Sequence, residues 1–220
     1  MKNPFSFVIV VLAALFLTGI RSEAQVTKIG RSVNYLSHFI ASDYFSELRK
    51  SNTDLALIDT IYLRALQYNC GDHAEALLDL AFATVPFNKI PAVIPLIRLH
   101  VNIPLPAAKD SIFELKNKNL PGKFIFDSPI DAYGDKDKLA HFFGSAYLAY
   151  VSRIFDFTEI IGIFVEEFEA KFYVQSAVDP RDLFADYLGE LFGKAIKKKG
   201  KILPSEVFVF YPLTYFRYRL

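Results

Sequence analysis

The sequence predicts a mainly α-helical protein, and three features favour this class. Apolar side chains recur at helical spacing in the N-terminal half and again in the C-terminal half. Residues typical of helix starts and ends flank those segments. A proline-rich stretch separates the two halves. We therefore expect a helical hairpin, a proline-rich connector and a C-terminal unit of three helices, with a short strand near the C-terminus.

The N-terminal helical region, residues 31–84, should contain three helices. The apolar spacing predicts the first over residues 31–50 and the second over residues 54–68. Gly71 suits the end of the second helix, and Asp72 is a good N-cap for the third. The last two helices should form an antiparallel hairpin that is similar to one tetratricopeptide unit without a second copy. One such unit cannot bury its own apolar face, so we expect it to pack on the rest of the protein.

The connector, residues 85–134, is rich in proline and apolar residues. Frequent proline removes backbone donors, so no long helix is expected here. The prolines are Pro86, Pro91, Pro95, Pro104, Pro106, Pro121 and Pro129. Because many of its other side chains are apolar, the segment should wrap the helical core or, alternatively, lie along a membrane surface. Packing on the core is the interpretation that we favour.

The C-terminal half should hold the three-helix unit, residues 135–200, and an aromatic and basic tail, residues 201–220. The helices are expected over residues 136–156, 158–173 and 180–199. Asp135 can cap the first, and Pro180 is well placed at the first position of the third. In the tail, the alternation of Val207, Val209 and Tyr211 indicates a short strand that Pro212 interrupts.

The first 24 residues have the pattern of a signal peptide. Lys2 provides a positive start, an apolar run spans Phe5 to Ile20, and small residues stand at Ser22 and Ala24. An uncleaved anchor is the alternative, although the run is shorter than the roughly 20 residues of a spanning helix. Lipidation is not expected, because Ile20 stands where a lipoprotein signal needs cysteine. We expect export to the periplasm or cell envelope.

Charge and cysteine content narrow the classes of partner. The chain has 25 basic and 24 acidic residues among 220, so no overall field attracts it to nucleic acid. Cys70 is the only cysteine, which excludes an intramolecular disulfide. We expect its thiol to be buried, the alternative being a disulfide with another chain.

Polar residues recur on the apolar C-terminal helices. Asp137 and His141 are four residues apart and should touch, whereas Lys138 should point elsewhere. Asp182 and Asp186 have the same spacing on the third helix. On the expected middle helix, Glu166, Glu167 and Glu169 interrupt an apolar segment. Since buried carboxylates need partners, these groups should meet in one cluster shared by the three helices.

The pattern D-K-x-x-H at 137–141, an acidic helix and D-x-x-x-D-x-x-G at 182–189 resembles the VanZ-like family and the related small YfiM-type envelope proteins. The spacing from Glu167 to Asp182 also fits that family. The resemblance covers roughly residues 135–195. The resemblance implies that five residues of this chain occupy the family's signature positions and that two glycines are packing positions. These residues are Asp137, Lys138, His141, Glu167, Asp182, Gly189 and Gly193.

Three positions depart from the family pattern. Ala170 stands where the family has glutamine, Ser176 where it often has arginine, and Asp186 where it has asparagine. A ligand site that uses glutamine and arginine would therefore be weakened. VanZ-like domains are commonly embedded in the bilayer, but Arg153 cuts the first apolar run short of a spanning length. We expect a helical domain that rests on a membrane rather than crosses it.

Two functions compete for the polar cluster. In the favoured one, Asp137, His141, Glu167, Asp182 and Asp186 form a structural network, and the domain binds a lipid or envelope partner without chemistry or cofactor. In the other, the same region is a metal-dependent hydrolase acting on a lipid-linked phosphate or ester. Asp137, His141 and Asp182 would then hold a divalent ion, Glu167 would act as general base and Lys138 would contact phosphate. No H-E-x-x-H, G-x-S-x-G or glycine-rich phosphate loop supports this alternative.

A basic and aromatic patch near the C-terminus suggests a partner. Lysines crowd residues 194–201, and the tail adds Arg217 and Arg219 among tyrosine and phenylalanine. Such patches lie at lipid headgroups. A solvated helix end followed by a packed tail is the alternative, and the sequence favours it slightly.

Overall fold

The computed structural model describes residues 23–94, 99–152 and 180–217. The protein is mainly helical, as predicted. Residues 1–22 of the expected signal peptide and the expected middle helix, 158–173, lie outside the described residues. The elements are α2 (Glu23–Ala41), α3 (Asp43–Ser51), α4 (Asp54–Tyr68), α5 (His73–Ala83), β1 (Lys89–Ile94), β2 (Leu99–Pro104), α6 (Asp110–Asn119), α7 (Lys138–Val151), α9 (Pro180–Lys199) and α10 (Pro204–Arg217).

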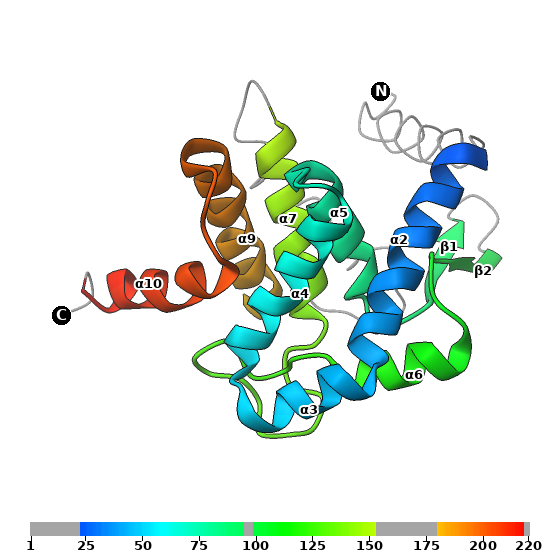
Figure 1. Ribbon diagram of the computed structural model, residues 1–220, viewed down its shortest axis with the longest axis horizontal. Coiled ribbons are helices and arrows are strands. Elements are labelled where there is room, and N and C mark those ends of the chain that lie inside the picture. Colours follow the sequence, from blue (N-terminus) through cyan, green and yellow to red (C-terminus); the bar gives the residue numbers. More distant parts are fainter. Residues whose placement is uncertain (1–22, 95–98, 153–179, 218–220) are drawn as a thin grey trace.

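The helices pack around a single apolar core. In Figure 1, α2, α5, α7 and α9 follow one another across the molecule, and α2 packs on α5, α5 on α7 and α7 on α9. Helix α4 packs on α5, while α10 contacts α4 and α9. The largest fully buried apolar side chains are Tyr62, Phe45, Phe142, Phe143 and Phe192. The hairpin of α4 and α5 is thus docked on the C-terminal helices, as the sequence predicted.

The first expected helix, residues 31–50, is two helices. Ser42 separates α2 from α3, and its hydroxyl accepts a hydrogen bond of 3.2 Å from the Phe45 amide. A serine with extended backbone is a strong N-cap, and it starts a new helix although the apolar spacing continues. The prediction of one helix was therefore wrong.

The turn between α4 and α5 follows the sequence prediction. Asp72 caps α5, with its carboxylate accepting bonds of 2.9 and 3.2 Å from the Ala74 and Glu75 amides. Gly71 has φ +89°, and Cys70 before it has φ +53°. This turn leaves Cys70 exposed, so the expectation of a buried thiol was wrong.

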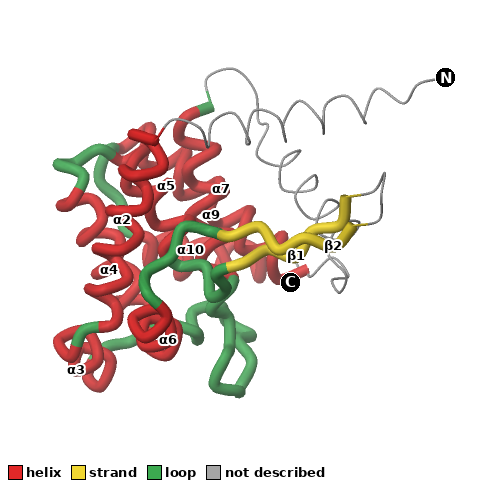
Figure 2. The backbone as a smooth tube through the Cα atoms, turned by 90° about the vertical axis from the view of Figure 1, so that its right-hand side faces the viewer, coloured by secondary structure: helices red, strands yellow, loops and turns green. Residues whose placement is uncertain are grey.

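The connector is more regular than its prolines suggested. Strands β1 and β2 pair as an antiparallel hairpin with Ala92 opposite Val101, and Figure 2 shows this hairpin extending from the helices. Helix α6 then packs on α2. Pro106 and Pro121 flank α6 rather than interrupt it, which explains why a ten-residue helix forms in this segment.

A buried lysine joins α6 to the end of α5. Lys116 Nζ donates hydrogen bonds of 3.1 and 2.6 Å to the Ala83 and Val85 carbonyls. Ala83 is the last residue of α5 and Val85 follows its C-cap, so an ammonium group there suits the helix dipole. Burial lowers the pKa of Lys116 to about 7. The connector is thereby fixed to the helical core.

The tail forms a helix where a strand was expected. Pro204 is the first residue of α10, and Glu206 accepts a bond of 2.8 Å from the Leu203 amide, as in a capping box. Val207 and Phe208 are both buried, whereas Val209 is exposed. Two buried neighbours fit a helix face and not the period of two of a strand. The alternation of valines was therefore misleading.

Helices α7 and α9 run parallel and touch backbone to backbone. A Cβ on Gly189 would lie 2.1 Å from the Phe142 carbonyl oxygen, and one on Gly193 would lie 2.2 Å from that of Ala146. The contacts advance in the same direction along both helices, from Lys138 beside Asp182 to Ala146 beside Gly193. Both glycines thus lie where the two helices pack closely.

This contact yields a stability prediction. Gly193→Ala should lower the free energy of unfolding by about 2–3 kcal/mol, since a methyl group there forces the backbones apart. Gly144→Ala is the matched control on α7, because its Cβ would meet only Ala81 at 4.0 Å. The control should be neutral or gain up to about 1 kcal/mol from helix propensity. Urea unfolding measures both; equal effects would contradict the close packing.

Candidate functional site

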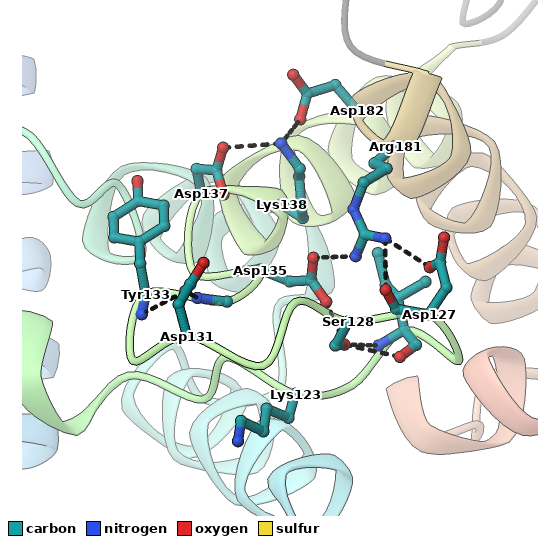
Figure 3. Close-up of polar contacts among 12 residues, drawn as sticks. Lys123, Asp127, Ser128, Asp131, Tyr133, Asp135, Asp137, Lys138, Arg181 and Asp182 are labelled. Carbon is teal, nitrogen blue, oxygen red and sulfur yellow. Dashed lines mark hydrogen bonds and ion pairs between the residues drawn. The ribbon is translucent and has the colours of Figure 1, made fainter.

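The polar cluster lies where the N-terminal ends of α7 and α9 meet (Figure 3). Asp137 immediately precedes α7, and Asp182 is in the first turn of α9. The parallel packing brings these two carboxylates to the same end of the helix pair. Both therefore lie near the positive ends of helix dipoles, which favour anionic groups.

Lys138 occupies the centre of this cluster. Its Nζ lies 2.8 Å from Asp137 Oδ2 and 2.5 Å from Asp182 Oδ1, and its side chain is almost fully buried. The prediction that Lys138 points elsewhere was wrong. As the first residue of α7, Lys138 has a long side chain that can reach across to α9, which helical spacing along α7 alone does not reveal.

His141 and Asp186 extend the cluster one turn along the helices. His141 Nε2 is 3.8 Å from Asp182 Oδ1, and its Nδ1 is 3.5 Å from Asp186 Oδ1. Ser145 donates a hydrogen bond of 2.6 Å from its hydroxyl to Asp186 Oδ1. The structure thus brings Asp137, His141, Asp182 and Asp186 together with Lys138, while Glu167 lies outside the described residues.

A second ionic group, which the sequence analysis missed, surrounds Arg181. Its guanidinium pairs with the fully buried Asp135 and lies 2.6 Å from Asp127 Oδ1. Asp135 also accepts a hydrogen bond from the Ser128 hydroxyl, and Arg181 donates one of 2.9 Å to the Asp127 carbonyl. These bonds attach the loop before α7 to the start of α9 (Figure 3).

Asp135 consequently does not cap α7. The residue at the N-cap position is Asp137, without a side-chain capping bond. Asp135 instead turns inward and holds Arg181, because a buried carboxylate requires a charged partner. The only hint in the sequence was that an arginine precedes Asp182. The loop that contacts Arg181 has no regular spacing, so its pairing with Arg181 could not be predicted.

Burial raises the pKa of Asp182 above its ordinary value, although the charges of His141 and Lys138 act in the opposite direction. Partial burial, together with the charge of Asp137, raises the pKa of Tyr133 to about 12. Lys138, Asp182 and Asp186 are buried, whereas Tyr133 at the edge of the cluster is 50% exposed. The cluster is therefore an internal ionic network more than an exposed set of acids.

Metal binding and membrane crossing find no support among the described residues. They contain no group of three or more histidine, cysteine, aspartate or glutamate side chains that could hold a metal ion. The Lys138 ammonium lies between two of the expected ligands, where a divalent ion would meet a positive charge. None of the described helices has both the length and the apolar character needed to span a bilayer.

Comparison with other proteins gave no match: no family model, curated protein or solved structure is significantly similar to this chain.

The raised pKa of Asp182 leads to a pH prediction. Between its ordinary pKa of 3.8 and the higher folded-state value, the folded protein binds more protons than the unfolded chain. Wild-type stability should therefore fall as pH rises through this window, and this loss should be absent in Asp182→Asn. Urea unfolding of both proteins measures the difference between their free energies of unfolding. This difference should change in favour of the asparagine variant as pH rises through the window, and then stay constant.

The same pH trend should persist when both proteins also carry His141→Gln. Because these variants lack the imidazole, its titration cannot be the cause of the trend. A difference that stays constant from the acid limit to neutral pH would contradict the burial of Asp182.

Proposed function

We propose that this protein is an exported, envelope-associated binding module in which the cluster around Lys138 has a structural role. The observation that most directly supports this proposal is the position of the Lys138 ammonium between the carboxylates of Asp137 and Asp182. The protein itself provides the cation that these acids need. A catalytic carboxylate would instead have to meet substrate, water or a metal ion.

The geometry supports a role in helix registry. Lys138 joins the start of α7 to the first turn of α9, and Ser145 joins the next turn to Asp186. Buried polar contacts of this kind favour one alignment of packed helices over others, even where their net contribution to stability is small. The close glycine contacts further along the pair depend on that alignment.

The location rests on the sequence. The N-terminal segment has the composition of a signal peptide, and the motifs around Asp137, His141 and Asp182 resemble VanZ-like and YfiM-type envelope proteins. The contacts of His141 with Asp182 and Asp186 support that resemblance, because separate motif positions become neighbours.

The structural role predicts a large cost for removing the central cation. Lys138→Met should lower the free energy of unfolding by about 3 kcal/mol, because two largely buried carboxylates lose their partner. Lys50→Met is the control, since Lys50 pairs with Glu47 at 2.6 Å on the surface. That change should cost less than about 1 kcal/mol. Equal small losses in urea unfolding would contradict the proposal.

Cell fractionation tests the envelope location, and metal analysis tests the alternative of a metal-dependent hydrolase. The chain produced with residues 1–24 should be recovered from the envelope fraction, and mass spectrometry should identify Gln25 as the new N-terminus. Purified protein should contain no stoichiometric Mn²⁺, Mg²⁺ or Zn²⁺, and these ions should not raise its melting temperature. Recovery only from the cytosol would refute the envelope location, and a saturable metal-dependent rise in melting temperature would favour the hydrolase instead.

A further inference from the structure

Helix α10 is apolar along most of its sequence, and two of its described apolar side chains are exposed. Its sequence, PSEVFVFYPLTYFR, has only two charged residues, Glu206 and Arg217. In Figure 1 its far end extends away from the body of the molecule. A helix with apolar residues around most of its circumference is normally covered by protein or lipid.

The first turn and a half of α10 is firmly attached. Ser205 donates a hydrogen bond of 2.6 Å from its hydroxyl to Asp59 Oδ2, and its amide donates one of 2.9 Å to Asp59 Oδ1. Phe208 packs edge-on against Phe124, with ring centroids 5.2 Å apart. The direction of the helix is therefore set by the core.

Two apolar side chains follow this anchored turn and face solvent. Val209 is 46% exposed and Phe210 is 61% exposed. They are adjacent to the buried pair of Val207 and Phe208, so the helix is apolar on its inner and its outer sides. Core packing explains the inner side only.

The segment leading into α10 is strongly basic. Residues 194–203 contain five lysines and no acidic residue, although the whole chain has a formal net charge of only +1. Lys198, Lys199 and Lys201 are exposed. The positive charge is thus concentrated at the end of α9, where it also suits the helix dipole.

We propose that α10 and these lysines form a docking surface for an anionic lipid bilayer. The proposal rests on the envelope-binding function above and names its partner. Lysines bind anionic headgroups while aromatic and aliphatic side chains enter the headgroup boundary, so an anionic bilayer would use both features. A second copy of the chain would explain the apolar side chains but would place like charges near each other.

The test is sedimentation of the full chain with phosphatidylcholine vesicles that contain or lack phosphatidylglycerol. Wild-type protein should bind the anionic vesicles, and binding should weaken with added salt. Lys198→Gln, Lys199→Gln and Lys201→Gln together should weaken binding roughly a hundredfold, since each lysine near an anionic surface contributes about fivefold. Residues 1–24 are the same in all variants, so any contribution from them is constant.

Two matched controls make the result specific. The charge control replaces the exposed Lys109, Lys118 and Lys123 by glutamine.

The apolar test, Val209→Ser with Phe210→Ser, should weaken binding at least about tenfold. Its control replaces Leu115 (46% exposed) and Tyr44 (64% exposed) by serine. Both controls should bind like wild type.

Several results would overturn the docking surface. These are equal binding to neutral and anionic vesicles, control variants that lose as much as the test variants, and a self-association that Val209→Ser with Phe210→Ser abolishes. If wild type binds no vesicle while it still fractionates with the envelope, this inference fails and the proposed function stands. Thermal melting of each variant confirms that it is folded.

Discussion

The close parallel contact of α7 and α9 is the constraint on which the rest of the structure depends. Gly189 and Gly193 allow the two backbones to touch, and no larger residue fits at either position. At such a distance the helices resist sliding, because the Phe142 and Ala146 carbonyls of α7 lie directly against Gly189 and Gly193 of α9. The same alignment brings the two N-terminal ends together, so that Lys138 can reach Asp182. The ionic cluster is a consequence of the glycine contacts as much as a support for them.

The start of α9 connects two groups of charges that would otherwise be separate. Arg181 turns toward Asp135 and the loop before α7, whereas its neighbour Asp182 turns toward Lys138. Neighbouring residues in a helix point about 100° apart, which is why one helix end can hold both partners. The loop, α7 and α9 are thereby joined at one end, and the buried carboxylates of Asp135 and Asp182 each pair with a basic side chain. Internal charge compensation of this kind requires no ligand.

Local signals in the sequence predicted much of the fold, and long-range ones failed. Asp72 and Gly71 were predicted correctly, because a cap acts within a few residues of its own helix. The grouping of His141 with Asp182 and Asp186 was predicted because buried carboxylates need partners, and not from spacing, which relates residues of one helix only. The position of Lys138 was missed, because helical spacing placed it away from the face of Asp137 and His141. Pro204 and Glu206 are a local helix-start signal, but the prediction for the tail relied on the alternating valines alone.

Parallel packing gives the helix pair two chemically different ends. At the N-terminal end, acidic groups lie near the positive ends of the dipoles and are neutralised by Lys138 and Arg181. At the C-terminal end, the lysines from Lys197 onward suit the negative dipole, but residues 194–203 provide no carboxylate of their own. A nearly neutral chain therefore carries a compensated end and a basic one. The proposed function assigns the compensated end to helix alignment, and the proposed docking surface assigns the basic end and α10 to an anionic partner. Binding experiments should accordingly begin at the end of α9 and along α10.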